Sequence, residues 1–509
     1  MSKFSAFAHL LICTFAHFPY LRKVIELVKQ KFINNKESFQ LYLGSSLISV
    51  FNFLSIVLLS HFLLPAEYGV FRYVLMLVSI AVALGSMGFA QSIYYYLQKS
   101  QDAQQAYNYI NALRVGLMLS AVLVIIGLFI YQALFGVSNT FLDWNRFNIW
   151  IILLIIPGIF QSVELNIFLS IRKMSSYFVN TLSILSLKVA FIFIASTMKA
   201  SLIHYVFILG ITAVLPSIFN TIVIEKYFAS QKFQLHLSYL KQLWKYGLPI
   251  GIGLLFGVFM SQADKMLLAY IFKDPLSIAI VSNGNFDVPL ITVFYTSFSA
   301  IAFPYMVKAY QNNNIAELID IRRKYQKEVV LILFPIVVAF IAWSPSFIRF
   351  AFGEFYTQSA ALFAVYSITF FLRFNSYHDI FLITNRTKYI SYIQGIEMVF
   401  HLLLTYFLIQ QYGPIGASFA AVITNILYAF ACIFISKLIL NVRMIDIVPF
   451  WYLYKIVFIA TAVMFPFYFI GYLFGSHLFN IITAGIYVIS CILLLYKLEV
   501  PKHKESSDA

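Results

Sequence analysis

Long runs of apolar residues, separated by short polar stretches, make up most of this 509-residue chain. A helix needs about 20 consecutive, mostly apolar residues to cross the hydrocarbon core of a bilayer. Hydrocarbon offers the backbone N–H and C=O groups no outside partner, so we expect every run of that length to be a spanning helix. Fourteen runs qualify, at residues 41–64, 73–97, 110–134, 147–171, 174–198, 200–224, 246–272, 275–307, 329–348, 355–385, 389–411, 412–436, 456–474 and 478–496.

The sequence excludes two alternatives to a helical membrane protein, a membrane β-barrel and a soluble protein. The strands of a membrane β-barrel are about 10 residues long and alternate in polarity, whereas these runs are longer and uniformly apolar. A soluble protein carries about 25% charged residues, but this chain has only 11%, against 61% hydrophobic residues. The chain is therefore expected to be an all-α integral membrane protein.

The distribution of Lys and Arg supports the count of fourteen spans and predicts on which side of the membrane the termini lie. If the N-terminus is cytoplasmic, 26 of the 35 Lys and Arg residues lie on the cytoplasmic side, five lie outside and four lie within spans. Cytoplasmic connections of membrane proteins collect Lys and Arg. We predict a multi-pass membrane protein with both termini in the cytoplasm. This bias explains the net charge of +15 without a nucleic-acid partner.

The spacing of the spans predicts two lobes. A connection of about 20 residues before the seventh span separates two six-helix lobes, which we expect to surround a central cavity, and two helices follow them. A second long connection, at 308–328, is also expected to be a solvated amphipathic linker. The predicted parts are an interfacial N-terminal segment at 1–37, the first lobe at 38–225, a cytoplasmic linker at 226–245, the second lobe at 246–437, two C-terminal helices at 438–497 and a cytoplasmic tail at 498–509.

Basic side chains at membrane depth are the first candidates for function. An Arg or Lys at the centre of a membrane helix is costly, so such residues usually face a water-filled cavity or a partner. Lys188 and Arg373 lie near the middle of their spans, while Lys265 lies in an outer half and Arg114 close to the cytoplasmic boundary. Arg114 could also extend its side chain to the membrane surface. Cations that face a cavity favour an anionic substrate.

Acidic side chains form a second set of candidates. Glu397 and His401 are four residues apart and share a helix face, so they could bind a proton or Na⁺, or form a structural hydrogen bond. Asp264 is another candidate for cation coupling, and because it neighbours Lys265, the two side chains should point about 100° apart and not face one another. The other buried acids are Glu164, Asp287 and Asp379, the last of which could cap or pair near a helix end.

Signatures of enzymes and cofactors are absent from the sequence. It contains no phosphate-binding P-loop and no G-x-S-x-G nucleophile elbow. Its three cysteines, Cys13, Cys432 and Cys491, lie far apart in apolar surroundings, with no metal-binding spacing. We therefore expect a transporter with no cofactor and no metal, apart from a coupling H⁺ or Na⁺.

Several short stretches resemble the polysaccharide (O-antigen) flippase family, whose members belong to the multidrug/oligosaccharidyl-lipid/polysaccharide exporter superfamily. Together they run from about residue 40 to 440 in the family's order. They are LLPAEYGVF at 63–71, GSMGFA at 85–90, YGLP at 246–249, SQADK at 261–265, FGEFY at 352–356, NRTK at 385–388 and YGPIGAS at 412–418.

The resemblance implies a two-lobed bundle around a central cavity that is often basic. It also implies a substrate, an oligosaccharide linked by pyrophosphate to a polyprenol, which is moved from the cytoplasmic to the outer leaflet by cation-coupled alternating access. Membrane lipid and other polysaccharide-assembly membrane proteins are the implied partners. The family has no universal catalytic motif, so the candidate residues above rest on charge placement alone.

Two other functions remain open at this point. A drug or cation antiporter of the same superfamily would have an acid-dominated cavity, and the buried charges here, four basic and five acidic, do not decide between the two transporters. A polysaccharide polymerase or a membrane acyltransferase belongs to a different class. A polymerase typically needs a sizeable external loop, and the longest predicted here covers only about residues 135–146.

Overall fold

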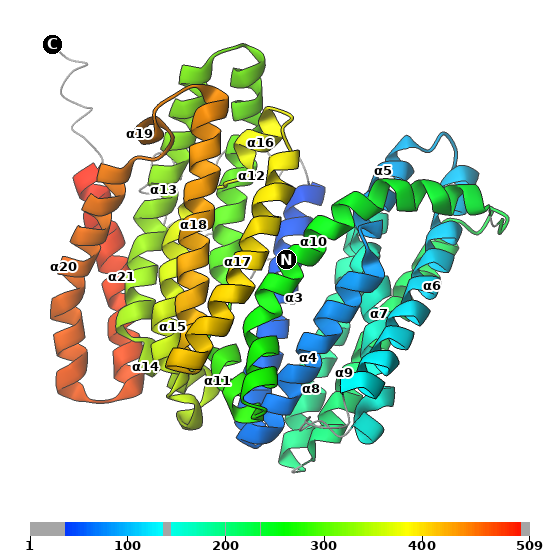
Figure 1. The fold of residues 1–509 in the computed structure, drawn as a ribbon, viewed down its shortest axis with the longest axis horizontal. Coiled ribbons are helices and arrows are strands. Elements are labelled where there is room, and N and C mark those ends of the chain that lie inside the picture. Colours follow the sequence, from blue (N-terminus) through cyan, green and yellow to red (C-terminus); the bar gives the residue numbers. More distant parts are fainter. Residues whose placement is uncertain (1–35, 136–143, 199, 235, 500–509) are drawn as a thin grey trace, which may run out of the picture.

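The computed structural model describes residues 36–135, 144–198, 200–234 and 236–499. In these ranges every regular element is a helix, as predicted. The predicted interfacial segment and the C-terminal tail lie mostly outside the described residues. Figure 1 shows two groups of helices side by side, with a helical hairpin on the outer face of the second group.

The first group is a bundle of seven helices. Its members are α3 (Lys36–Phe62), α4 (Pro65–Ser86), α5 (Phe89–Lys99), α6 (Ala103–Phe135), α7 (Trp144–Ser170), α8 (Met174–Thr197) and α9 (Leu202–Tyr227). Helix α3 packs on α8 and also contacts α12 and α14 of the other group. Pro157 and Pro216 stand inside α7 and α9 without ending them.

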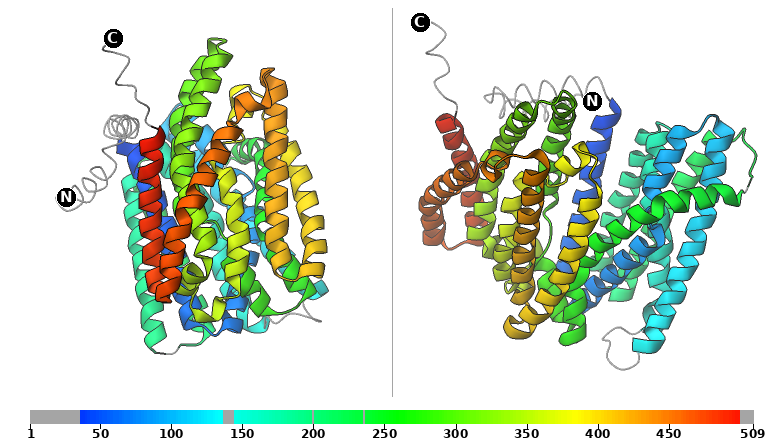
Figure 2. Two further views of the ribbon diagram at one scale, coloured as in Figure 1. Left: turned by 90° about the vertical axis from the view of Figure 1, so that its left-hand side faces the viewer. Right: turned by 45° about the horizontal axis from the view of Figure 1, so that its top comes forward.

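Helix α10 (Leu237–Ile271) joins the two groups. It is 35 residues long and contains Pro249. Its neighbours include α4, α5 and α6 of the first bundle, and α11 and α17 of the second. In Figures 1 and 2 this helix runs obliquely between the two groups. The predicted linker at 226–245 is therefore helical from Leu237 onward.

The second bundle is made of shorter and more interrupted elements. They are α11 (Pro275–Gly284), α12 (Pro289–Gln311), α13 (Ile315–Ala342), α14 (Ser344–Phe352), the 3₁₀ helix η1 (Glu354–Tyr356), α15 (Ser359–Ser367), the 3₁₀ helix η2 (Ile368–Phe374), α16 (Asp379–Ile383), α17 (Lys388–Tyr412), α18 (Ile415–Leu440) and α19 (Met444–Ile447). The hairpin of α20 (Phe450–Phe474) and α21 (His477–Glu499) packs against α13.

Twelve helices among the described residues are long and apolar enough to cross a membrane. The two other predicted spans, at 275–307 and 355–385, are occupied by interrupted helices. In the first of these, Pro289 fixes the break, because proline has no N–H and disfavours helical geometry in the residue before it. The protein is thus a multi-pass membrane protein, and the count of fourteen crossings stays a prediction.

The kink between α4 and α5 brings the backbone into direct contact with α10. Gly88 has a φ of 75°, a left-handed conformation that glycine adopts at little cost. A Cβ atom there would lie 2.1 Å from the carbonyl oxygen of Gly247 in α10. Gly88, in the turn before α5, and Gly247, in α10, therefore allow the two backbones to touch.

The segment at 308–328, predicted to be a solvated amphipathic linker, is amphipathic but is not wholly solvated. Helix α13 begins at Ile315, so most of the segment is helical. Arg322 is 1% exposed and Gln326 is fully buried, because this part of α13 packs against η2 and α19. Charge alone marked the segment as solvated, but one face of the helix is covered by neighbouring elements.

Candidate functional site

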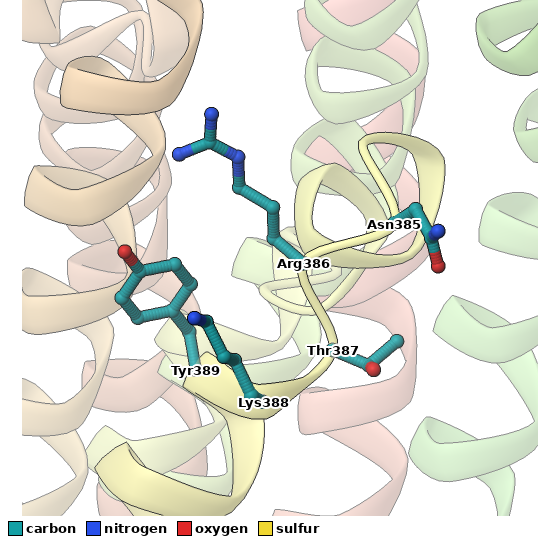
Figure 3. A pocket seen from close by; sticks show the side chains of 5 residues that line it. All are labelled: Asn385, Arg386, Thr387, Lys388 and Tyr389. Carbon is teal, nitrogen blue, oxygen red and sulfur yellow. The ribbon is translucent and has the colours of Figure 1, made fainter.

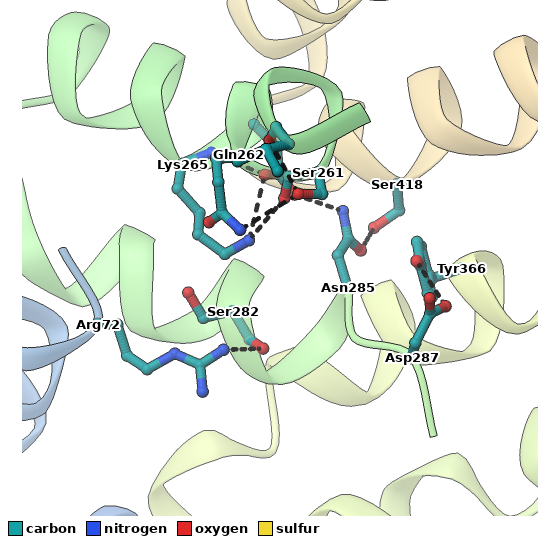
Figure 4. Close-up of polar contacts among 11 residues, drawn as sticks. Arg72, Ser261, Gln262, Lys265, Ser282, Asn285, Asp287, Tyr366 and Ser418 are labelled. Atoms are coloured by element: carbon teal, nitrogen blue, oxygen red, sulfur yellow. Dashed lines mark hydrogen bonds and ion pairs between the residues drawn. The ribbon is translucent and has the colours of Figure 1, made fainter. Parts of the chain in front are cut away.

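Polar side chains from three helices meet at the break between α11 and α12. The amide of Asn285 donates a hydrogen bond of 3.2 Å to the Asp264 carboxylate on α10. Its carbonyl oxygen accepts a bond of 2.5 Å from the Ser418 hydroxyl on α18. Asn285 is the first residue after α11, so the break brings α10, α11 and α18 to one point (Figure 4).

Lys265 and Asp264 form an ion pair at this point. The Lys265 ammonium lies 3.6 Å from the Asp264 carboxylate and donates a 3.1 Å bond to the carbonyl oxygen of Ser261. The prediction that these neighbouring residues do not face one another is wrong, because the long lysine side chain folds back along α10. Both residues are less than a tenth exposed.

A second ion pair lies just beyond the break. The Arg373 guanidinium, from η2, donates to both oxygens of Asp287 at 3.1 and 3.2 Å. The hydroxyl groups of Tyr366 and Tyr295 lie 3.2 Å from Asp287 and Arg373, respectively. The side chains of Arg373 and Asp287 are 29% and 46% exposed, so this pair is accessible while the Lys265 pair is covered.

Arg72, which lies between the predicted spans at 41–64 and 73–97, is a third cation near the break. It donates a 2.9 Å bond from α4 to the carbonyl oxygen of Ser282 in α11 (Figure 4). One turn earlier on α4, the Tyr68 hydroxyl donates a 2.8 Å bond to the Asn283 side chain. These bonds fasten the first bundle to the start of the second. The sequence placed the helix start at Tyr73, whereas proline at the first helical position of α4 shows that it begins at Pro65.

We refer to five charged residues as the break cluster: Arg72, Asp264, Lys265, Asp287 and Arg373. Their three cations and two acids are linked electrostatically, since Lys265 interacts with Asp264, Arg72 and Asp287. Two of the four predicted anion-binding residues, Lys265 and Arg373, belong to it, as do Asp264 and Asp287.

The other two predicted anion-binding residues lie in the first bundle. Lys188 is 7% exposed, and its ammonium donates a 2.8 Å bond to the Asn52 side chain on α3. Arg114 forms an ion pair with Glu225, which also accepts a 2.7 Å bond from the Tyr107 hydroxyl. Lys188 thus has a neutral partner, whereas the charge of Arg114 is matched by an acid.

The predicted pair of Glu397 and His401 is not joined by a hydrogen bond. The buried His401 ring lies 3.0 Å from the Thr424 hydroxyl on α18. Glu397 makes no hydrogen bond or ion pair with any described residue, and it interacts electrostatically with Tyr428 and Cys432. Residues four apart share a face of α17, as predicted, but the hydrogen-bond partner of His401 is Thr424 on α18.

The remaining predicted acids each have hydroxyl or amide partners. Glu164 accepts a 2.6 Å bond from Asn220. Asp379 accepts bonds of 2.5 Å from Ser376 and 3.3 Å from Ser299. Neither acid forms an ion pair within the part of the chain that the structure describes.

A second buried polar group lies where η2 ends. The carbonyl oxygen of the Asn375 side chain accepts bonds of 2.7 Å from Arg322 and 2.9 Å from Gln326. Arg322 also donates to the backbone oxygen of Ser376 at 3.1 Å. The sequence did not indicate this group, because Arg322 stands among other charged residues of α13 that are exposed.

A pocket of about 380 Å³ lies at the turn before α17. Figure 3 shows its lining, residues 385–389, which include the NRTK motif. Arg386 and Lys388 are exposed there, so the pocket is basic. Over the described ranges, no group of three or more His, Cys, Asp or Glu side chains could hold a metal ion.

Comparison with known proteins gives a family match and a fold match. A family described as "Polysaccharide biosynthesis protein" matches residues 35–310, which is more than half of the chain. No curated protein matches the chain in sequence.

Three solved structures share the fold. The first is described as "Lipid II flippase MurJ, inward closed conformation"; it is 14% identical, covers 90% of this chain and 98% of its own, and has a TM-score of 0.69. An inward-facing multidrug resistance MATE family transporter of the MOP superfamily is 15% identical, with coverage of 77% and 94% and a TM-score of 0.56. A MOP superfamily transporter from Pyrococcus furiosus is 14% identical, with coverage of 79% and 94% and a TM-score of 0.54. At such identities the likeness shows the fold alone, which is that of membrane transporters and flippases.

Proposed function

The chain belongs to the polysaccharide biosynthesis protein family, and on that premise we propose that it is a flippase for a polyprenyl-pyrophosphate-linked oligosaccharide. In this proposal it moves a repeat unit of O-antigen, capsule or exopolysaccharide from the cytoplasmic to the outer leaflet of a bacterial cytoplasmic membrane. Both termini are cytoplasmic in this arrangement. The fold it shares with the lipid II flippase supports a lipid-linked substrate.

The break cluster is the observation that carries the proposal. Three cations gather there around the ends of interrupted helices, and one of them, Arg373, is partly exposed. Arginine presents a planar set of donors that matches phosphate oxygens in a bidentate manner. Asp287 accepts from one guanidinium nitrogen of Arg373, Nη2, and the Tyr295 hydroxyl accepts from the other, Nη1, so a pyrophosphate would compete for these donors.

The arrangement of the helices supports alternating access. The hydrogen bonds from Tyr68 and Arg72 to α11 hold the two bundles together at one end. If a pyrophosphate drew Arg373 away from Asp287, the Asp287 carboxylate would lose its partner. The break cluster would then contain an unpaired negative charge. Lys188 and Arg114 would contact the substrate from the first bundle once the bundles have moved.

Cation coupling belongs to the same proposal. Asp264, Glu397 and His401 are the candidate residues, and H⁺ or Na⁺ is the coupling ion. Asp264 contacts the Lys265 ammonium and the Asn285 amide, and an ion that neutralised it would release Lys265 from its pair. Other polysaccharide-assembly membrane proteins would supply the substrate and receive it.

Mass spectrometry of polyprenyl-linked glycans, with and without the gene, tests this function. The flippase predicts that a complete repeat unit on polyprenyl pyrophosphate accumulates on the cytoplasmic side when the gene is deleted. If these lipids are unchanged and the cells become more sensitive to toxic cations, the flippase proposal is wrong and the drug or cation antiporter takes its place. Altered chain length with normal flipping would point to a polymerase.

Complementation with charge-removing variants tests the site. The double variant Arg373→Ala with Lys188→Ala should abolish transport while expression persists. Arg443→Gln is the matched control, because the Arg443 side chain is 82% exposed outside the spans. Full activity of the double variant would refute the assignment of these residues.

A further inference from the structure

An exposed group of tyrosines on α5 and α10 has no role in the transport mechanism proposed above. Tyr94 and Tyr95 of α5 and Tyr246 of α10 are 39%, 40% and 38% exposed. The rings of Tyr95 and Tyr246 are stacked, with centroids 4.6 Å apart and planes inclined by 10°. We refer to these three residues as the tyrosine shelf.

Neighbouring aromatic rings hold the shelf in place. The Tyr96 ring meets Tyr95 edge-on at 5.1 Å and stacks on Tyr109 of α6 at 4.9 Å. Tyr109 in turn packs against Tyr239 of α10 at 4.5 Å and donates a 2.6 Å bond to Gln242. Contacts from three helices thus fix the rings, so a ligand that stacked on them would order few side chains on binding.

Polar side chains of α5 lie beside the shelf. Gln91 and Gln98 lie three residues before and four residues after Tyr94, so they share its helix face. Both are exposed, and neither these amides nor the shelf hydroxyls make a hydrogen bond with any described residue. The Lys99 ammonium lies 5.9 Å from the centroid of the Tyr95 ring. This face of α5 therefore combines aromatic rings with unused donors and acceptors.

The depth of Gln91 indicates that the shelf meets water and not lipid. Gln91 lies eight residues before the end of α5 at Lys99, which is about 12 Å from the helix end. An amide group without a partner is costly in hydrocarbon. The exposed face of α5 is therefore expected to line a water-filled space.

The shelf lies on the side of α10 that faces the second bundle. Gly253 comes seven residues after Tyr246 and so lies on the same helix face. A Cβ atom on Gly253 would lie 3.9 Å from the Ser391 hydroxyl of α17. Tyr246 also lies 19 residues before Lys265, about 28 Å along α10. The shelf and the break cluster are therefore separate sites on one helix.

We propose that the tyrosine shelf binds the sugar rings of an oligosaccharide. The C–H face of a sugar ring is apolar and stacks on aromatic rings, while its hydroxyl groups exchange hydrogen bonds with amides and phenols. The shelf and its two glutamines offer both kinds of contact. This inference rests on the proposed function and deepens it. The break cluster takes the pyrophosphate, and the shelf, on the cytoplasmic side in the proposed orientation, takes the glycan as the substrate enters.

Binding of a free oligosaccharide to the purified full-length protein tests the shelf without the lipid. The probe is the repeat-unit oligosaccharide prepared from the host's surface polysaccharide, and saturation-transfer NMR in detergent measures its dissociation constant. Tyr95→Leu and Tyr246→Leu should each weaken binding at least about 10-fold, because a stacking surface is lost. Tyr246→Phe keeps the ring and should weaken binding only about 3-fold.

Two further variants complete the set. Tyr454, near the start of α20, is 66% exposed, so Tyr454→Leu is the matched control and should leave binding unchanged. Gln91→Leu replaces an exposed side chain that no described residue contacts by a hydrogen bond, and it should weaken binding about 3-fold. This variant tests the shelf even if leucine at Tyr95 or Tyr246 prevents folding.

Sugar-free polyprenyl pyrophosphate distinguishes a glycan site from a lipid contact. The shelf variants should bind this lipid as well as the wild type does. An equal loss with this lipid would place the tyrosines in an interfacial aromatic belt and overturn the proposal. A wild type that does not bind the free oligosaccharide, or binding that persists in the Leu variants, would also overturn it.

The shelf and the flippase can fail separately. If the lipid-linked unit accumulates when the gene is deleted but the oligosaccharide does not bind, the shelf is refuted and the flippase stands. If the lipids are unchanged, the flippase is refuted, whatever the shelf binds.

Discussion

The two bundles handle buried charge in different ways. In the first bundle α7 and α9 continue through their prolines, the break between α4 and α5 lies against Gly247, and the buried Lys188 and Glu164 each contact a neutral asparagine and no opposite charge. In the second bundle two predicted spans are interrupted, and charged residues from several elements gather at the interruptions. A broken helix brings side chains and free backbone groups to one place, which a continuous helix cannot do. The difference supports the proposal that the second bundle holds the anionic part of the substrate.

The largest effect expected from this comparison is on transport. Arg373→Gln should reduce flipping of the lipid-linked oligosaccharide at least about 100-fold, because a bidentate contact to a phosphate group is lost. Lys188→Gln should reduce it only about 10-fold, because Lys188 is covered by α3 in this conformation. Flipping in proteoliposomes measures both. Equal losses would show that the bundles share the anion equally.

A large effect on stability is expected at the end of η2. Asn375→Leu leaves the buried Arg322 without its side-chain acceptor and should destabilise the protein by about 3 kcal/mol. Adding Arg322→Met removes the unpaired charge, so the double variant should lose less than Asn375→Leu alone. Thermal unfolding in detergent measures the difference. A double variant less stable than either single variant would mean that Arg322 is held by other contacts.

An intermediate effect is expected at the kink between α4 and α5. Gly88→Ala combines a left-handed backbone with a clash against the Gly247 oxygen, and should cost about 2–4 kcal/mol. Gly475 is the matched control, since it has a similar left-handed backbone, with a φ of 63°, but no atom lies within 4 Å of its Cβ position. Gly475→Ala should therefore cost only about 1 kcal/mol. Similar unfolding midpoints for the two variants would contradict a tight contact at Gly88.

The smallest effect, on stability, is expected for the ion pair of Arg114 and Glu225 in the first bundle, because this pair lies near the surface. The side chains of Arg114 and Glu225 are 25% and 43% exposed. Exposed ion pairs contribute less than about 1 kcal/mol, so Arg114→Gln should barely shift the unfolding midpoint. A loss of flipping without a loss of stability would instead give Arg114 a role in substrate entry.

Hydropathy and charge bias predicted the membrane class and the positions of most helices, because those properties depend on local sequence. They also marked five charges that are buried, Glu164, Lys188, Asp264, Lys265 and Asp379, but they did not predict the burial of Arg322 or the partners of these charges. Arg72 lies near the start of a helix, and Arg322 lies among exposed charges, yet both are positioned by elements distant in the sequence. The meeting of Asp264, Asn285 and Ser418 depends on the break before Pro289 and on the packing of α18, which no local pattern contains.

The long helix α10 has a mechanical consequence. With 35 residues it measures about 52 Å, well beyond the roughly 30 Å of the hydrocarbon core. One half is attached to α5 and α6, and the other to α11 and α17, so the helix acts as a lever between the bundles. Pro249 cannot donate to the carbonyl four residues earlier, which makes this the compliant point of the lever. Rotation of one bundle must therefore either bend α10 beside Gly247 or carry the other bundle with it.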